Sequence, residues 1–122
     1  MQVTNCSPYL YMKGNDPVLD AEFSAASAYG KVKPGKTSLF WKTGLRWYSI
    51  PMTEVQRIFR RVERMHIRAC GGGRPFVSEW LVLVLQEDAE LVIHITDNDQ
   101  KKAERLLQAL REMHPEMQYG KE

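Results

Sequence analysis

Residues 80–113 read WLVLVLQEDAELVIHITDNDQKKAERLLQALREM, and this stretch decides most of the fold. Residues 80–85 are a short apolar run rich in side chains that favour β-strands, and residues 91–95 are a second such run. The polar residues between them make a connection of hairpin length. We therefore expect an antiparallel hairpin with strands over about 77–86 and 90–96.

A helix is expected directly after this hairpin. Asp97, Asn98 and Asp99 offer side-chain oxygens for an N-cap, and the two carboxylates suit the positive end of a helix. Apolar residues then recur at helical spacing, and Pro115 stands just beyond them, where a helix should stop. The pattern predicts a helix over 99–113 whose buried face carries Leu106, Leu107, Leu110 and Met113.

A second hairpin lies upstream. Residues 38–41 and 45–50 are aromatic and β-forming, they flank Lys42-Thr43-Gly44, and Pro51 closes the pair because proline cannot donate to a sheet ladder. The N-terminal third is less regular. There the sequence favours a short strand over 9–12, a strand or helix over 20–29, and a basic loop over 30–36.

The segment 53–68 has two interpretations. Its apolar residues recur at helical spacing, which on periodicity alone predicts an amphipathic helix: Val55, Ile58, Phe59, Val62 and Met65. As a strand the segment alternates less well, because Ile58 and Val62 share one face while Val55 and Phe59 share the other. Local pattern alone leaves both structures open.

Three consecutive pieces of the chain carry a family resemblance. TSLFWK over 37–42, LRWYSIPM over 45–52 and TEV over 53–55 resemble bacterial pleckstrin-homology-like (PH-like) domains, and the terminal hairpin and helix match them too, so that the resemblance spans about 37–113. It implies a mainly β fold: a barrel of about seven antiparallel strands, with 55–66 as a strand, capped by one C-terminal helix. The alternative is an α+β fold with 53–68 helical.

Length and composition bound the remaining possibilities. A chain of 122 residues and 43% hydrophobic content fits one domain, 1–122, with a core of its own. No apolar run is long enough to span a membrane, and the N-terminus lacks the pattern of a signal peptide. We expect a cytoplasmic protein in which Cys6 and Cys70 are free thiols.

The sequence offers no chemistry that points to an enzyme. His66, His94 and His114 are scattered singly, and no C-x-x-C or paired-histidine spacing suggests a metal. No cofactor fingerprint or nucleophile–base pair is recognisable. The glycines at 71–73 lead into a strand rather than a helix, so we interpret them as a mobile connection and not as a phosphate loop. We expect neither catalysis nor a cofactor.

Charge is distributed unevenly along the chain. Residues 53–76 carry six arginines against two glutamates, a net +4, whereas residues 77–122 carry five basic against ten acidic groups, a net −5. The isoelectric point of about 8.6 is lower than that of most nucleic-acid binders, so we do not expect nucleic acid as a partner. We expect the arginines to act mainly in structure and surface electrostatics. If 55–66 is a strand, Arg57 and Arg61 project on one side and Arg60 and Arg64 on the other, and those that do not face solvent should meet carboxylates such as Glu63, Glu87 or Glu90. The candidate anion- or partner-binding residues are Lys31, Lys33, Lys36, Arg46, Arg60, Arg64, Arg68 and Arg74.

Two functions remain. The first is a non-enzymatic interaction or assembly module that binds a protein, including another copy of itself, with Trp41, Trp47 and Trp80 as candidate anchors. The alternative is a binder of anionic ligands or of a membrane surface through the Lys/Arg clusters. Lipid-binding PH domains use a basic first hairpin loop and basic residues on the next strand. Here that strand supplies only Lys42, which weakens the comparison.

Overall fold

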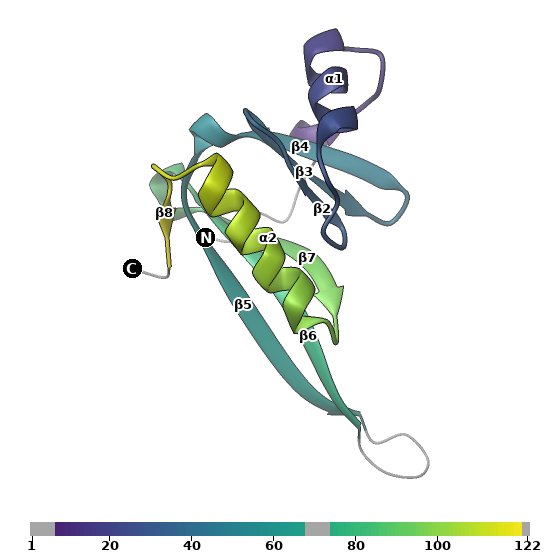
Figure 1. Ribbon diagram of the computed structural model, residues 1–122, viewed down its shortest axis with the longest axis vertical. Helices are drawn as coiled ribbons and strands as arrows, with labels where there is room; N and C mark the ends of the chain where they lie inside the picture. The colour runs from purple at the N-terminus through teal and green to yellow at the C-terminus, as the bar shows by residue number, and fades with distance from the viewer. Residues whose placement is uncertain (1–6, 68–73, 121–122) are drawn as a thin grey trace.

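The computed structural model describes residues 7–67 and 74–120 (Figure 1). Two helices are present, α1 (Pro17–Ala25) and α2 (Gln100–Met113). The strands are β1 (Leu10–Tyr11), β2 (Val32–Pro34), β3 (Ser38–Thr43), β4 (Arg46–Pro51), β5 (Val55–Ile67), β6 (Arg74–Leu85), β7 (Glu90–Asp97) and β8 (Gln118–Tyr119). The chain is thus mainly β with a C-terminal helix, as the sequence predicted.

The strands form two four-stranded sheets. One has the order β1-β4-β3-β2 and the other the order β7-β6-β5-β8. All pairings are antiparallel except the short β5–β8 contact, which is parallel. At the junction of the sheets, Lys31 N donates to Ile95 O at 3.0 Å. Among the described residues the two ladders do not join into a closed barrel.

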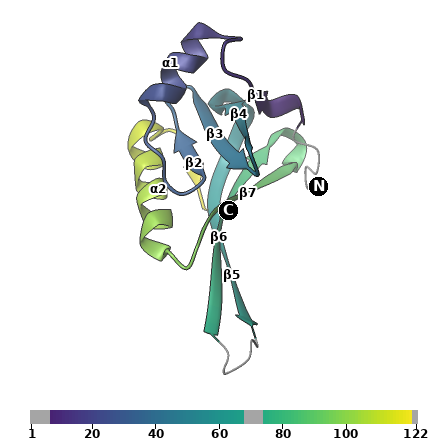
Figure 2. The same cartoon turned by 90° about the vertical axis from the view of Figure 1, so that its right-hand side faces the viewer.

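The core lies where the two sheets and α2 meet (Figures 1 and 2). Leu39 and Ile50 come from the first sheet, Leu81 and Ile93 from the second, and all four are fully or almost fully buried. Helix α2 adds Ala103, Leu106, Leu107 and Leu110. The spacing rule therefore predicted the buried face of α2 well, except that Met113 is 39% exposed.

Helix α1 covers the other face of the first sheet. Asp16 caps it by accepting from the N–H groups of Val18 and Leu19, and Pro17 suits its first turn. Beneath it, aromatic rings pack edge to face, with Phe23 5.1 Å from Phe40 and 5.0 Å from Trp47 between centroids. Of the two possibilities for 20–29, the strand is wrong: the chain is helical as far as Ala25, because the Asp16 cap and the packing of Phe23 favour a helix.

One carboxylate fastens α1 to the turn between β2 and β3. Glu22 accepts hydrogen bonds from Thr37 N at 2.7 Å, from Thr37 Oγ1 at 2.6 Å and from Ser38 N at 2.8 Å. At the same turn, His114 Nε2 lies 2.8 Å from Gly35 O. The segment expected to be a basic loop, 30–36, therefore contains a strand and is held from both helices.

The segment 55–67 is the strand β5, so the helical alternative for 53–68 is wrong. Its main chain pairs with β6 along its whole length. The backbone N–H and C=O groups that a helix would have paired within itself are here paired with β6 instead. Apolar residues are buried on both faces of the strand: Ile58 is 0% exposed and its neighbour Phe59 is 8% exposed. Burial on both sides is what produced the misleading periodicity.

The ends of β5 and β6 form a two-stranded arm. Pairing with β7 ends at Ser78 on β6, and pairing with β8 ends at Ile58 on β5. Beyond these points the two strands pair with each other as far as Ile67 and Arg74. Figures 1 and 2 show this ribbon projecting away from the rest of the molecule. Neither helix of the described residues is long and apolar enough to cross a membrane.

Candidate interaction surface

The structure does not bring the predicted cations into one cluster. Lys31, Lys33, Lys36 and Arg46 belong to the first sheet and its turns, whereas Arg60 and Arg64 lie on β5. Arg74 begins β6, and Arg68 lies outside the described residues, as do Cys6, Cys70 and the glycines at 71–73. The eight residues are therefore at least two separate sets, which have to be considered independently.

Lys33 is held by the aromatic cluster under α1. Its Nζ lies 3.9 Å from the centroid of the Phe23 ring and 5.4 Å from that of Trp47. It also donates to Phe23 O at 3.4 Å. The ammonium group is thus stabilised by ring faces and a carbonyl within the chain. We conclude that Lys33 serves the packing of α1, while Lys31, Lys36 and Arg46 remain exposed.

The β3–β4 hairpin ends in an exposed leucine between cations. Gly44 has φ +62° and makes the turn, which places Leu45 at its tip with 95% of its surface exposed. Lys42 and Arg46 flank the tip. No Asp or Glu occurs between residues 23 and 53, so the first sheet has only positive formal charges.

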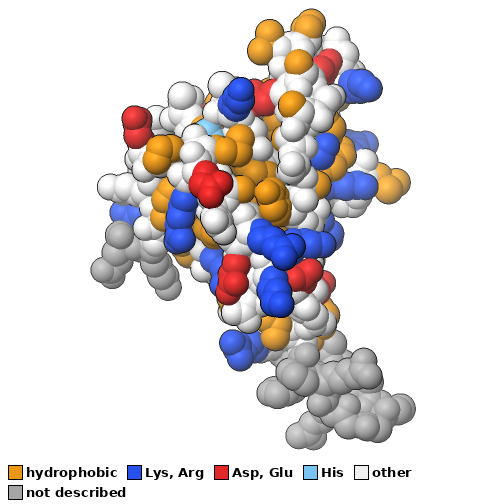
Figure 3. Space-filling view, viewed as in Figure 1, with side chains coloured by type: hydrophobic (Ala, Val, Ile, Leu, Met, Phe, Trp, Pro, Cys, Tyr) orange, Lys and Arg blue, Asp and Glu red, His pale blue; other side chains and the backbone are white. Residues whose placement is uncertain are grey.

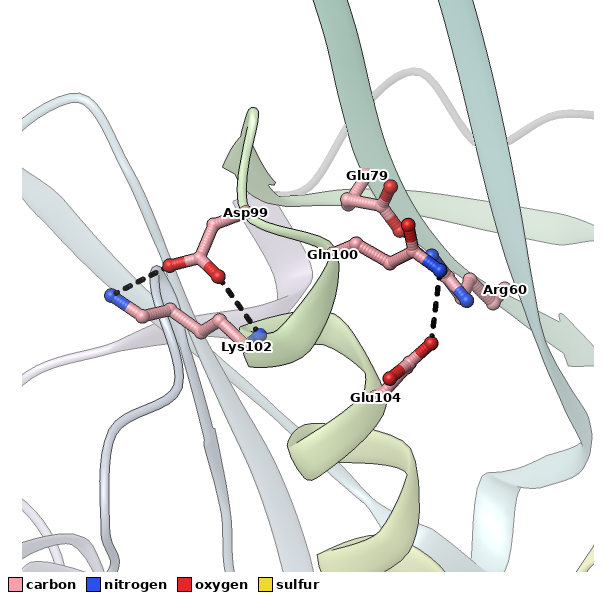
Figure 4. A network of polar contacts seen from close by, with 6 residues as sticks. All are labelled: Arg60, Glu79, Asp99, Gln100, Lys102 and Glu104. Carbon is pink, nitrogen blue, oxygen red and sulfur yellow. Dashed lines mark hydrogen bonds and ion pairs between the residues drawn. The ribbon is translucent and has the colours of Figure 1, made fainter.

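Arg60 binds Glu79, a carboxylate that the sequence pattern does not single out. Its Nε donates to Glu79 Oε1 at 2.5 Å, and Glu79 is only 1% exposed (Figure 4). The nearby N-terminus of α2 is capped by Asp99, which accepts from Lys102 N at 3.1 Å. Glu79 was missed because a glutamate before an apolar run usually faces water, whereas here it lies on the inner face.

Arg61, on the opposite face of β5 from Arg60, has the kind of partner that the sequence predicted. Arg61 and Glu90 lie 3.8 Å apart across the outer face of the sheet, and Glu90 was one of the carboxylates proposed for this role. The expected separation of Arg60 and Arg64 from Arg61 on opposite faces agrees with the pairing register of β5 with β6. The arginines of β5 therefore split between the two faces of the arm.

One edge of the arm has no strand beside it among the residues that the structure describes. Gly120 N donates to Ile58 O at 3.0 Å, so the carbonyl of Ile58 points away from β6. Along a strand, every second residue points its N–H and C=O to the same side. After Ile58, the residues whose main-chain groups point away from β6 are therefore Arg60, Val62 and Arg64. β8 ends beside Ile58, and no other described strand adjoins β5 on this side.

Apolar side chains also gather between α1 and the C-terminal part of α2 (Figure 3). A groove of about 610 Å³ lies at the end of α2, and its lining includes Met52, Met113 and Met117. A smaller hollow of about 370 Å³ beside α1 shares Met113 and Lys36 with it. Methionine side chains adapt easily to different shapes, which suits a variable apolar contact.

Ser78, His94 and Asp97 are close together but are not arranged for nucleophilic catalysis. Ser78 Oγ donates to Asp97 Oδ1 at 2.8 Å, and His94 Nε2 lies 2.8 Å from the same oxygen. A base would have to stand between the hydroxyl and the carboxylate. Burial opposes ionisation of Asp97, but its hydrogen bonds with His94 and Ser78 dominate and lower the pKa of this carboxyl. The described residues contain no group of acidic, His or Cys side chains that could hold a metal ion.

The tryptophans differ as candidate anchors. Trp41 is 2% exposed and belongs to the core, and Trp47 is half-buried against Phe23 of α1. Trp80 lies on the outer face of the second sheet, 4.8 Å from the His94 ring. Only the last two reach the surface. Comparisons with protein-family models, curated proteins and solved structures find no match for this chain.

Proposed function

We propose that the protein is a non-enzymatic, PH-like cytoplasmic module that binds other protein chains by adding a strand to the free edge of β5. The observation that carries this proposal is that β8 ends beside Ile58, whose carbonyl points away from β6, so that strand alternation directs the main-chain groups of Arg60, Val62 and Arg64 to the same side. Strand addition uses such groups for affinity and the alternate side chains for specificity. The PH-like assignment is supported by one sheet built from β1–β4, followed by β5, β6, β7 and α2, whereas α1 between β1 and β2 and the final β8 are additions to that order.

The length and composition of the arm support binding at this edge. A two-stranded hairpin alone is marginally stable in water, so an arm of this length gains from a further strand. Exposed edges are usually shortened or interrupted by proline or a bulge. The β5 bulge lies between Val55 and Arg57, before the free part, and residues 59–67 contain no proline. Among the described residues, the edge-protecting feature that remains here is the charge of residues 60–64, which disfavours a strand of like charge and leaves the main chain open to a neutral or complementary one.

The test uses short peptides of alternating Val and Thr as probes. NMR titration should shift the amide signals of Arg60, Val62 and Arg64 more than those of neighbours that bond to β6. Val62→Pro removes one outward N–H without removing a bond to β6, and should abolish the shifts. Leu45→Ser, on the remote hairpin, is the matched control and should leave them unchanged. Equal shifts in Val62→Pro would contradict strand addition.

The exposed tip of the first sheet supports a second candidate function, which is attachment to an anionic membrane surface. Leu45 is positioned to enter the headgroup region, and Lys31, Lys42 and Arg46 would contact anionic lipid. Each cation near such a surface contributes about 1 kcal/mol. The absence of acidic residues from 23 to 53 favours this orientation.

Vesicle sedimentation distinguishes this second function from the first. The protein should pellet with vesicles that contain about one third phosphatidylserine and should be released as salt is raised, because exposed charges are screened. Leu45→Ser and Arg46→Gln should each weaken the binding, whereas Val62→Pro should not. Equal binding to neutral phosphatidylcholine vesicles would exclude the electrostatic part of this function.

A further inference from the structure

We infer that the strand that adds to β5 is β5 of a second copy, paired antiparallel about a two-fold axis at Val62. This inference rests on the proposed function, because it requires the same free edge. The axis is perpendicular to the plane of the sheet. Each residue therefore faces the residue of the other copy that lies the same number of positions from Val62 in the opposite direction along the chain. The two facing side chains lie on the same face of the sheet. The contact is self-complementary and closed.

The charges of the edge select Val62 as the axis. Residues 60–64 read RRVER, and of these five residues only Val62 is uncharged. An axis at any of the other four would place a residue opposite its own copy, and like charges directly opposite each other destabilise a strand pair. Val62 is 38% exposed, and pairing on the axis would bury it against its symmetry mate.

The neighbours of the axis then pair with opposite charge. Arg61 meets Glu63 of the second copy, and by symmetry Glu63 meets Arg61, so that two ion pairs flank the valines. These residues fall at positions without main-chain bonds, where facing side chains approach most closely. Arg61 is 40% exposed and its present contact with Glu90 is long, at 3.8 Å, so its guanidinium group can turn toward the second copy.

Two symmetry-related pairs in this register, Arg60 with Arg64 and Arg64 with Arg60, are unfavourable, and the fold weakens their effect. Arg60 meets Arg64 of the second copy on the inner face. Glu79, however, is 1% exposed and bonded to Arg60, so the positive charge of Arg60 is largely compensated within its own chain. The pairing extends over Arg60–Arg64, because β8 occupies the edge beside Arg57 and Ile58.

The arms can pair over Arg60–Arg64 only, and beyond Arg64 the end of each arm has to diverge from β5 of the other copy because β8 lies there. The arm projects from the body, so two arms lying antiparallel place the bodies at opposite ends (Figure 1). Three outward-facing residues per chain give about six main-chain hydrogen bonds across the axis. Such a contact buries less surface than a permanent dimer, so we expect association that depends on concentration.

Sedimentation equilibrium on the full chain tests the inference. The average mass of the wild-type protein should rise from 14.1 kDa toward twice that value as its concentration approaches about 1 mM. Arg61→Glu and Glu63→Arg should each remain monomeric, because each puts like charges opposite one another. An equimolar mixture of these two variants should form a heterodimer, and the double variant Arg61→Glu/Glu63→Arg should associate as the wild type does.

These variants separate the inference from loss of folding and from the proposed function. Recovery in the mixture shows that each single variant is folded, and circular dichroism melting curves provide a direct check. A wild-type protein that stays monomeric at about 1 mM, or a mixture that fails to associate, overturns the self-pairing. If the alternating peptides still shift the amides of Arg60, Val62 and Arg64, strand addition stands and only its occupant is wrong. If they do not, the proposed function fails as well.

Discussion

Arg60 and Glu79 form an ion pair at the root of the arm, and the two side chains are buried to very different degrees. Arg60 keeps 25% of its surface exposed, whereas Glu79 keeps 1%. Glu79 Oε2 has no hydrogen-bond partner among the described residues. The carboxylate therefore depends on Arg60 for compensation, because a buried charge without its partner is strongly unfavourable.

The pair leads to a prediction with a built-in control. Arg60→Ala should lower the free energy of unfolding by about 2–4 kcal/mol, because it leaves the Glu79 carboxylate buried without a counter-charge. Arg64→Ala, at an exposed position of the same strand, should cost less than about 1 kcal/mol. Urea denaturation measures both. This differs from the sequence-based expectation that the cluster is exposed, since Arg60 has a buried partner. Equal effects of the two substitutions would contradict the role of Glu79.

Asp97 gives the stability of the protein a dependence on acid pH. Its pKa lies below the ordinary value of 3.8: burial opposes ionisation, but the hydrogen bonds of His94 and Ser78 dominate. An acid whose folded-state pKa is lowered stabilises the fold above the unfolded-state pKa, and this contribution is lost as the pH falls through the folded-state value.

The corresponding experiment compares the wild type with Asp97→Asn. The wild-type free energy of unfolding should fall as the pH drops below about 3.8. The variant should lack this part of the fall, and the difference between the proteins should shrink at low pH. Because Asp97 is 38% exposed, the effect should remain below about 1 kcal/mol. A constant difference from pH 6 to pH 2 would assign the effect of the variant to something other than this ionisation.

Helix α2 is the element whose sequence pattern and packing agree best. Leu110 is 0% exposed within the shared core, while Met113, one turn later, is 39% exposed beside the groove. Leu110→Ala should therefore cost about 2–5 kcal/mol, and Met113→Ala should cost less than about 1 kcal/mol. Chemical denaturation with the midpoint followed by circular dichroism measures both. If both substitutions cost the same, the C-terminal turn would have to pack more tightly than its exposure indicates.

Elements whose pattern is local could be predicted, and elements that depend on distant partners could not. The two hairpins and α2 have their turn residues, caps and apolar spacing within one short stretch, and all three were predicted. β2 and β8 are short and exist because β3 and β5 pair with them, so no local signal announces them. β5 was predicted through the family resemblance and against its own periodicity, because burial of Ile58 and Phe59 on opposite faces imitates a helix.

The same distinction applies to the candidate site. The split of the arginines between two faces follows from the strand period and was predicted. The outward direction of the Arg60, Val62 and Arg64 main chain depends on where β8 ends, which only the assembled fold fixes. Likewise, the contact of the Lys33 ammonium group with the rings of Phe23 and Trp47 joins β2, α1 and β4, which are separate in the sequence. Sequence spacing contains no information about such contacts.

At the scale of the whole molecule, the two sheets share one core. The cluster of buried residues includes Leu39 and Ile50 from the first sheet, Leu83 and Ile93 from the second, and Leu106 from α2. Neither sheet can retain its apolar face if the other is lost. The described parts of the chain should therefore unfold as a single cooperative unit.

Cooperative unfolding is tested by comparing two probes. Tryptophan fluorescence, which includes Trp41 in the core, and far-ultraviolet circular dichroism should give the same urea midpoint. Leu39→Ala, in the first sheet, should shift both transitions together. A fluorescence transition that precedes the loss of circular dichroism would mean that the first sheet and α1 open separately.

The projecting arm also determines how the molecule rotates in solution. The arm extends the molecule along its longest axis, and α2 runs in nearly the same direction as β5 (Figure 1). Helical N–H bonds lie along the helix axis, whereas strand N–H bonds lie across the strand. An elongated particle tumbles end over end more slowly than it spins about its length. The amide nitrogens of α2 should therefore show faster transverse relaxation than those of β5 and β6, and antiparallel pairing of two arms would widen this contrast.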